Sequence, residues 1–361
     1  MTGTKRPKAQ ANEISDLLNQ VLGQDRFPVP VEDVALEYSQ QRFRDAPIAK
    51  VQGEDLDGFD GMLAANKKRD KWMILYNSAV SSEGRKRFTV AHEFGHYLLH
   101  RHQQEEFACG AGDIETSGEG KGSQHIEKEA DDFATTLLMP LDDFRRQVDG
   151  ETVSFDLLGH CADRYGVSLT AAAIRWLEIA PKRAVLVASR DDHMLWASSN
   201  EAAFKSGAFF ATRKNTIELP QSALANSRNC SGVPQSHDTR AQVWFAREPA
   251  EMPVTEMTKV AGNYGYTLTL LVMPEAERRW RRHDEDEGPV EDSPVGWVAP
   301  ATQHCLHNTC RPMQKPPQPR RSEAVGMGQV VWPSCRVVLG CTQPNLRQSF
   351  FDSCPRLLGK R

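Results

Sequence analysis

Residues 87–101 read Arg-Phe-Thr-Val-Ala-His-Glu-Phe-Gly-His-Tyr-Leu-Leu-His-Arg, with apolar residues before and after the string His-Glu-Phe-Gly-His. A helix that is apolar on most sides is typical of one buried under a sheet. In such a helix His92 and His96 lie on one face, because residues four apart are one turn apart, and their rings can share a Zn2+ ion. Glu93 then lies beside the metal and not on it. We therefore predict a zinc site in which Glu93 is the general base that takes a proton from a zinc-bound water.

A zinc site of this kind needs a third protein ligand and one open position. Residues 124–139 repeat apolar side chains at helical spacing, and Glu127 falls on the same side as they do. A carboxylate on an apolar helix face has to be paired or bound to a metal. Glu127 is therefore the predicted third ligand, with Glu129 as the second choice. Asp131 and Asp132 are expected to point mostly away from this face.

His102, six residues after His96, offers another third ligand, as in metzincins, where a Gly ends the helix between the two. Leu99 stands at that Gly position here, so the helix should continue and carry His102 away from the metal. His100 lies one turn past His96, and we expect it to end the helix or to support a ligand by a hydrogen bond. Tyr97 is expected to be a core aromatic residue and not an oxyanion donor.

The motif helix is followed, after a loop, by Glu127-Lys-Glu-Ala-Asp-Asp-Phe-Ala-Thr-Thr-Leu-Leu-Met-Pro140. Together the two stretches resemble the ImmA/IrrE family of bacterial zinc metallopeptidases. The resemblance is specific over residues 72–140, and the layout is similar from about residue 15 to about residue 275. It implies that His92 and His96 bind zinc with Glu127, and that Glu93 is the catalytic base.

Proteins like these cut a helix-turn-helix repressor, often encoded beside them, and so switch on stress-response or mobile-element genes. The resemblance therefore implies a protein substrate of that class. It also implies an α+β fold with a zincin-like metallopeptidase domain, which we place at residues 11–150.

The hydrophobic pattern around the motif predicts the neighbouring elements. Helices are expected at 11–22, at 31–38 and, after a cap at Ser82, over the motif; strands are expected at 58–66 and 71–77, around a polar turn. The edge strand of this hairpin is a candidate for binding an extended peptide substrate. Residues 1–10 are basic and polar, and are expected to be flexible.

Residues 151–182 have the rhythm of two helices joined by a Gly-Val-Ser turn, which resembles a helix-turn-helix. A DNA reader needs several long polar side chains on the outward side of its second helix. Ala171, Ala172, Ala173 and Arg175 offer one such side chain. We therefore expect a packing or substrate-docking role, and keep DNA binding as the alternative.

Residues 183–280 are expected to form a smaller, sensor-like α/β domain. Its strands are predicted at apolar runs between polar turns. These runs are 183–188, 194–197, 204–210, 217–219, 243–245, 254–257 and 266–273.

Residues 281–361 begin with a mixed-charge run and hold five of the eight Cys without any hydrophobic period, which predicts a disordered tail. His304, Cys305, His307 and Cys310 lie there, but their spacing fits no standard pair of zinc ligands.

The composition is that of an ordinary soluble protein, with 25% charged residues and a formal net charge of -4, which argues against a protein built mainly to hold nucleic acid. No apolar run reaches about 18 residues, and the start lacks the apolar core of a secretory signal. The Cys residues show no tight disulfide spacing. We therefore expect a cytoplasmic protein without a membrane partner.

These features together predict a zinc-dependent endopeptidase that cleaves a helix-turn-helix repressor. Two alternatives belong to other classes of protein. One is a DNA-binding transcriptional regulator in which the zinc is structural and residues 154–178 bind DNA, and the other is a toxin-antitoxin component that acts by binding alone.

Overall fold

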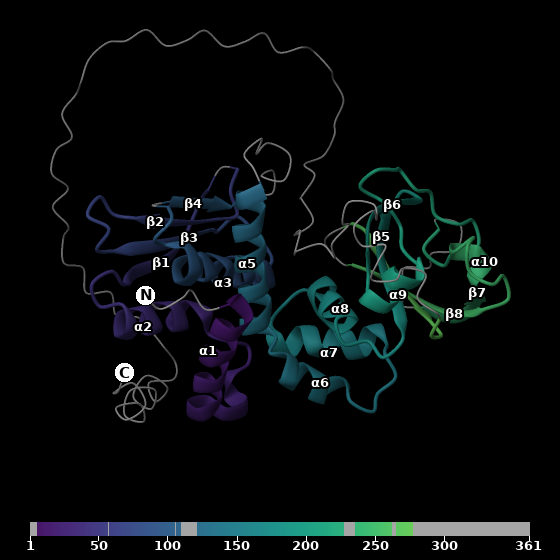
Figure 1. The fold of residues 1–361 in the computed structure, drawn as a ribbon, viewed down its shortest axis with the longest axis horizontal. Coiled ribbons are helices and arrows are strands. Elements are labelled where there is room, and N and C mark those ends of the chain that lie inside the picture. Colours follow the sequence, from purple (N-terminus) through teal and green to yellow (C-terminus); the bar gives the residue numbers. More distant parts are fainter. Residues whose placement is uncertain are drawn as a thin grey trace, which may run out of the picture. The chain divides into compact units, whose positions relative to one another are not determined.

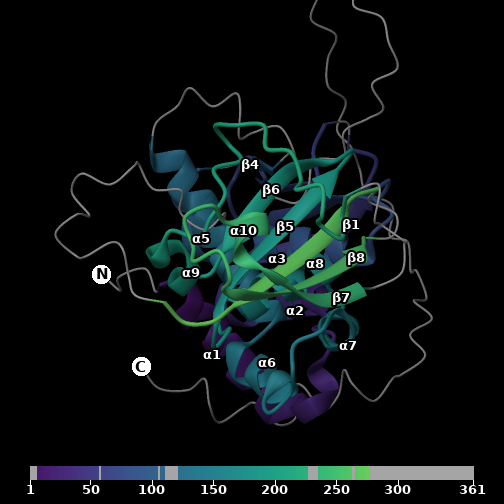
Figure 2. The same ribbon diagram turned by 90° about the vertical axis from the view of Figure 1, so that its right-hand side faces the viewer.

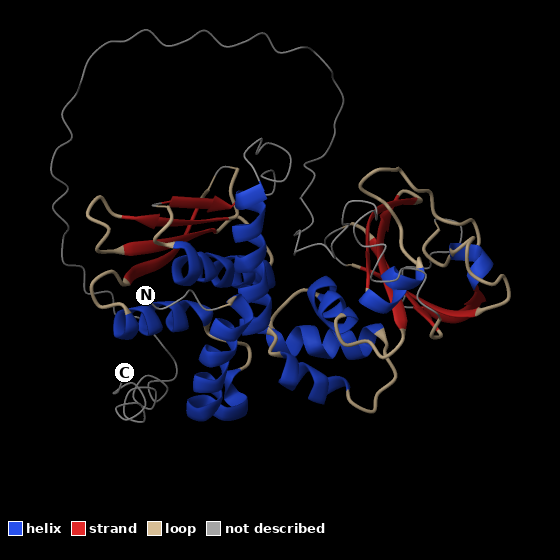
Figure 3. Cartoon of the chain, in the orientation of Figure 1, coloured by secondary structure: helices blue, strands red, loops and turns tan. Residues whose placement is uncertain are grey.

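The computed structural model describes residues 6–276, with gaps at 57, 105, 110–120, 227–234 and 262–264. The predicted tail from residue 281 lies outside the described residues, and so do His304, Cys305, His307 and Cys310. The described residues combine helices with two sheets, which confirms the mixed α+β class (Figures 1 and 3).

The first sheet and its helices are formed by the first half of the described chain. In order these elements are α1 (Pro7–Leu22), the 3-10 helix η1 (Gly23–Arg26), α2 (Val31–Arg42), β1 (Ile48–Glu54), β2 (Gly61–Ala65), β3 (Trp72–Asn77), α3 (Glu83–His100), β4 (Glu106–Cys109) and α5 (Lys121–Leu138). The strand order is β1-β3-β2-β4. Strand β1 runs parallel to β3, and the other neighbours are antiparallel.

Helix α3 covers one face of this sheet (Figure 1). The sheet turns Leu63 and Ile74 toward the core, where both are fully buried, while the alternate residues Met62 and Met73 are partly exposed. This is the two-residue alternation of a sheet with one covered face. The predicted hairpin is therefore confirmed, and it lies against the motif helix.

The predicted edge strand is wrong, because both strands of the hairpin have neighbours on either side. The edges are β1 and β4, neither of which was predicted. Six of the seven residues of β1 are at least partly exposed, and β4 is four residues long, so neither carries a clear alternating pattern. Short or half-exposed strands are common at sheet edges.

The starts of the helices follow local signals. Ser82 caps α3 as predicted, since its Oγ accepts a hydrogen bond from the backbone N of Arg85 at 3.3 Å. Helix α1 begins at Pro7, earlier than the predicted start at residue 11, because Pro fits the first turn of a helix.

Two glycines allow close packing around α3. A Cβ atom at Gly95 would lie 3.1 Å from the Phe133 ring and 3.2 Å from the Cα of Ala130, so the absence of a side chain lets α5 approach the motif helix closely. At the other end of α3, a Cβ atom at Gly84 would lie 3.1 Å from the backbone of Val167.

Three helices follow α5. They are α6 (Leu141–Val148), α7 (Phe155–Tyr165) and α8 (Leu169–Leu177). Pro140 is the N-cap of α6. Gly166 ends α7 with φ 60°, and Ser168 caps α8 through a hydrogen bond from the backbone N of Ala171 at 3.1 Å, so the predicted helix–turn–helix rhythm is present.

The second sheet has five strands, all antiparallel, in the order β6-β5-β9-β8-β7 (Figure 2). Its elements in chain order are β5 (Arg183–Arg190), β6 (His193–Ser199), α9 (Glu201–Ser206), β7 (Gln235–Arg240), α10 (Ala241–Trp244), β8 (Pro253–Val260) and β9 (Thr267–Met273). The α/β arrangement predicted for this part is therefore wrong, because α/β domains are built on parallel strands.

Several strands predicted in this part are corrected. The runs at 204–210 and 243–245 overlap the short helices α9 and α10, and 217–219 contributes a single bridge between His193 and Glu218. Asn200 caps α9 and Gly207 ends it with φ 86°, local signals that override an apolar run. Strand β7 was missed because it contains no apolar residue and pairs on one side.

The two faces of the second sheet have separate cores. Ala184, Leu186 and Ala188 of β5 share a core with α6, α7 and α8. The alternate residues Val185 and Val187 pack against α9 and α10 on the other face. Within the described ranges, no helix has the length and apolar character needed to cross a bilayer.

Candidate metal centre

Helices α3 and α5 bring three predicted ligands together. The Nε2 atoms of His92 and His96 are 3.0 Å apart. Oε2 of Glu127 lies 3.2 Å from the first and 3.5 Å from the second. Among the described residues, these three form the one group whose ligand atoms could hold a metal ion.

The spacing of these atoms fits zinc. A tetrahedral zinc ion with ligands at about 2.0–2.2 Å separates its ligand atoms by roughly 3.3–3.5 Å. The three measured separations lie close to that range. His96 is fully buried, whereas the Glu127 side chain is 42% exposed, so solvent reaches the group from one side. Two imidazoles and a carboxylate with one accessible side are the donor set of a catalytic zinc site.

Each imidazole has a hydrogen-bond partner on its other nitrogen. His92 Nδ1 lies 2.8 Å from Oδ1 of Asp131, and His96 Nδ1 lies 3.1 Å from Nδ1 of His100. The prediction that Asp131 points away is wrong. Asp131 follows Glu127 by four residues, so both lie on the same helix face. This spacing was visible in the sequence, but the prediction followed the apolar residues of the helix instead.

Glu129 contacts His100 and not the three ligand atoms. Its Oε2 is 3.0 Å from Nε2 of His100 and 3.5 Å from Nδ1 of His125, whose side chain is 70% exposed. His100 was predicted to support a metal ligand by a hydrogen bond, and in the structure it lies against Nδ1 of His96. His102 is exposed in the turn after α3.

Burial sets the charges of this group. It lowers the pKa of His96 to about 4, so the ring is neutral at neutral pH, which is the form that binds a metal. Burial acts to raise the pKa of Glu127, but the adjacent rings of His92 and His96 outweigh it and hold that pKa well below its usual range. A neutral His96 ring therefore faces a charged Glu127 carboxylate.

Glu93 is fully buried and lies between α3 and β2. A Cβ atom at Gly61 of β2 would be 2.9 Å from Oε1 of Glu93 and 2.3 Å from Cγ2 of Thr89. The strand therefore needs glycine at this point to make room for the Glu93 carboxyl. Gly61 was not singled out from the sequence, although an isolated glycine in a strand signals a close approach of this kind.

The aromatic residues near the metal group pack as core residues. Tyr97 is fully buried and donates a hydrogen bond to the carbonyl of Ala46 at 2.8 Å, and burial raises its pKa to about 12. This confirms its predicted core role. Phe107 of β4 stacks on the His96 ring with centroids 4.6 Å apart.

Helix α8 does not have the exposed polar face of a DNA-reading helix. Ala171, Ala172 and Ala173 are buried. Arg175 is also buried, with its guanidinium donating to the carbonyl of Met139 at 2.8 and 3.0 Å and to Glu178 at 2.7 Å. The one long polar side chain expected to face outward thus holds the end of α5 in place.

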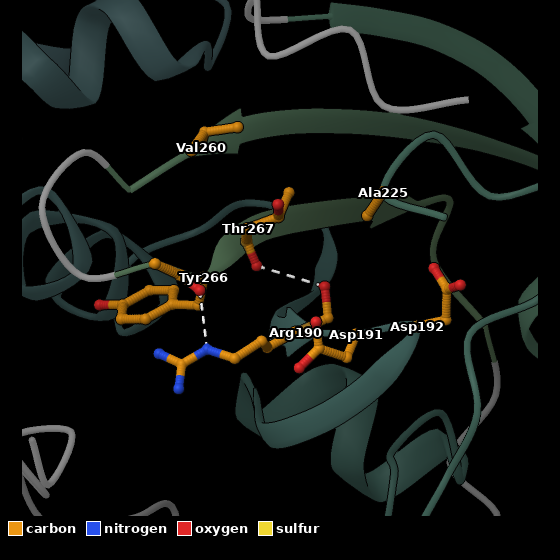
Figure 4. Close-up of a pocket in the computed structure, with 9 residues that line it drawn as sticks. Arg190, Asp191, Asp192, Ala225, Val260, Tyr266 and Thr267 are labelled. Carbon is orange, nitrogen blue, oxygen red and sulfur yellow. Dashed lines mark hydrogen bonds between the residues drawn. The ribbon is translucent and has the colours of Figure 1, made fainter. Parts of the chain in front are cut away.

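A separate cavity of about 340 Å³ lies in the second sheet (Figure 4). Its lining comes from the end of β5 and the turn after it, the end of β8, the start of β9 with the two residues before it, and Ala225. Arg190 Nε donates to the carbonyl of Gly265 at 2.7 Å at its edge. None of its lining residues belongs to α3 or α5, so the cavity is distinct from the metal group.

Comparisons with known proteins identify the first part of the chain. Residues 45–177 match the model of the IrrE N-terminal-like domain of M78 peptidases. A solved Mycobacterium tuberculosis transcriptional regulator is similar, with 15% identity and a TM-score of 0.45 over 74% of this chain and 81% of that chain. No curated protein gives a match. The domain match spans α3, α5 and the three convergent ligands, so residues 45–177 of this chain form an IrrE N-terminal-like domain of the M78 peptidase type.

Proposed function

We propose that this protein is a zinc-dependent endopeptidase whose metal is held by His92, His96 and Glu127. The observation that carries the proposal is the convergence of the three ligand atoms, 3.0 to 3.5 Å from one another, inside a peptidase-family domain. The partial exposure of Glu127 supports an open position for substrate. A purely structural zinc site is usually closed by four protein ligands.

Glu93 acts as the general base and acid of the reaction. Zinc, when bound, supplies Lewis acidity that activates a water and polarises a peptide carbonyl. Glu93 removes a proton from the attacking water and later gives it to the leaving amine. Its burial against Gly61 keeps the carboxyl in a low-dielectric setting and fixes its direction.

Strand β4 is the proposed binding edge for an extended substrate. It is an edge of the first sheet, and its Phe107 stacks on the ligand His96. An extended peptide paired with this edge lies beside the metal group and is held by main-chain hydrogen bonds.

The proposed substrate is a helix-turn-helix repressor, and its cleavage releases stress-response or mobile-element genes in the cytoplasm. The support is the match of residues 45–177 to a peptidase-family domain, since peptidases cut proteins or peptides. We assign residues 11–150 to a zincin-like metallopeptidase domain and residues 151–182 to a helical packing or docking segment. Residues 183–280 form a sensor-like domain, supported by the cavity near Arg190.

Replacement of Glu93 by Gln tests the catalytic assignment. The variant is expected to bind one zinc per chain, as measured by elemental analysis, and to lose cleavage of the repressor encoded beside the gene. Loss of a general base lowers the rate by about 100- to 10,000-fold. Glu83→Gln is the matched control, because Glu83 is a 75% exposed glutamate on the same helix and should leave cleavage unchanged. Retained cleavage by Glu93→Gln contradicts the assignment.

A further inference from the structure

We propose that Glu129 and His100 form a hydrogen-bond relay that fixes the tautomer of His96, which makes Glu129 a positioning residue for a metal ligand that it does not touch. The inference rests on the proposed zinc site. It adds a role for two residues that the zinc chemistry itself does not require.

The relay is a chain of two short contacts on the side of His96 away from the metal group. Oε2 of Glu129 lies 3.0 Å from Nε2 of His100. Nδ1 of His100 lies 3.1 Å from Nδ1 of His96. The remaining nitrogen of His96, Nε2, faces His92 and Glu127.

The chemistry of the groups fixes the direction of each hydrogen bond. An ionised carboxylate accepts only, so His100 must donate to Glu129 from Nε2. A neutral imidazole carries one N–H, which leaves Nδ1 of His100 as an acceptor. His96 must then donate from its own Nδ1, and the lone pair on its Nε2 points toward the metal group.

Burial and packing restrict the His96 ring to the orientation in which the relay holds its Nδ1. His96 and His100 are 0% and 1% exposed, and Phe107 stacks on His96 at an interplanar angle of 23°. A change of the His96 tautomer would bring the lone pairs of two Nδ1 atoms face to face at 3.1 Å, because His100 uses its one N–H to donate to Glu129. His92 is held differently, by direct contact with Asp131 at 2.8 Å. The two ligands thus have separate supports, one direct and one through a second ring.

The test measures zinc affinity of the full chain by competition with a chromophoric chelator. Glu129→Ala is expected to weaken zinc binding about 10- to 100-fold, as loss of a ligand's supporting partner does. Glu129 is 31% exposed on a helix, so Ala at this position should not disturb folding. Glu129→Gln retains an oxygen that accepts from His100, and is expected to restore most of the affinity.

Asp132→Ala is the matched control. Asp132 lies on the same helix, is 39% exposed and forms an ion pair with Lys8 at 3.5 Å. The Asp132→Ala substitution removes the same charge as Glu129→Ala but does not change a contact with a histidine. Zinc affinity should therefore stay at the level of the unchanged chain. Thermal unfolding of the metal-free proteins shows whether any variant acts through stability instead.

Three results overturn the relay. One is unchanged zinc affinity in Glu129→Ala. Another is a loss of zinc affinity in Asp132→Ala as large as that in Glu129→Ala, because such a loss would come from net charge alone. The third is an Nε2–H tautomer of His96 in metal-free protein, read from long-range 1H–15N correlations of labelled histidine. If the unchanged chain binds no stoichiometric zinc, the proposed function fails, and the tautomer measurement still decides the relay.

Discussion

The side chains of the metal group are fixed by neighbours on two sides. Asp131 and His100 hold the far nitrogens of the two histidines. Glu93 is fixed sterically, because α3 and β2 meet at Gly61 with no room for a side chain. The position of Glu93, the proposed general base, therefore depends on the absence of a side chain at Gly61, and adding a methyl group there tests this.

Gly61→Ala should reduce peptide cleavage more than it reduces stability. The new Cβ would lie 2.3 Å from Cγ2 of Thr89 and 2.9 Å from Oε1 of Glu93, so one or both side chains must move. A displacement of about 1 Å at a catalytic group costs roughly 100-fold in rate. The measurement is kcat for repressor cleavage, with zinc content as a check that the ligands remain in place.

The double variant Gly61→Ala/Thr89→Ser separates the two clashes. Serine lacks the methyl group of Thr89, so the double variant should recover stability, while the contact with Glu93 keeps cleavage low. Full recovery of cleavage in the double variant would mean that Glu93 had not been displaced.

The sequence predicted the metal residues better than their supports. His92, His96 and Glu127 follow from helical spacing and family motif, because a one-turn repeat places side chains on one face whatever surrounds them. Asp131 and Gly61 were not found, since their roles depend on which element packs against them, and that is a tertiary property. The hydrogen bonds of a buried ring cannot be read from periodicity alone.

At the level of helices and strands, the predictions held where burial imposed a period. The helix over 87–101 is buried on most sides and the hairpin of β2 and β3 has one buried face, and the sequence shows both patterns. The edge strands β1, β4 and β7 show little alternation of apolar and polar residues. They pair through backbone N–H and C=O groups, which every residue type except proline supplies, so their sequences do not reveal the pairing.

The contact between α3 and α5 decides whether Glu127 reaches the histidines, and Gly95 is part of that contact. We expect Gly95→Ala to push the helices apart, because its Cβ would lie 3.1 Å from Phe133 and 3.2 Å from Ala130. Overpacking of this kind costs about 1–3 kcal/mol. Zinc affinity should fall together with the free energy of unfolding, measured by chelator competition and by urea titration.

Gly159→Ala on α7 is the control for this change. A Cβ there meets a single atom, Nζ of Lys259, at 4.0 Å. Alanine in an open helical position stabilises by about 0.5–1 kcal/mol, so this variant should unfold at slightly higher urea and keep its zinc affinity. If Gly95→Ala also kept its zinc affinity and its stability, the distance between α3 and α5 would not control zinc binding.

Across the chain, the metal-binding part and the second sheet are joined through one shared core. Met139 and Phe144, just after α5, belong to the same apolar cluster as Leu186 of β5 and Leu268 of β9. Thr170 of α8 is also hydrogen-bonded to Tyr266, at 2.8 Å between the hydroxyls. Helices α6, α7 and α8 therefore follow α5 directly and share their core with the second sheet, which cannot lose them without exposing apolar surface.

Truncation after residue 182 should therefore impair the peptidase part even though every metal ligand remains. The fragment 1–182 lacks β5, β8 and β9, which cover one side of the helical cluster, so Leu158, Tyr165 and Trp176 lose packing partners. Burial of apolar surface stabilises by about 25 cal/mol per Å², and its loss should lower the melting temperature and increase binding of a hydrophobic dye. A fragment of residues 1–276 retains all described members of the cluster and is the control. Equal melting temperatures and equal zinc affinities for the two fragments would show that the second sheet does not support the metal centre.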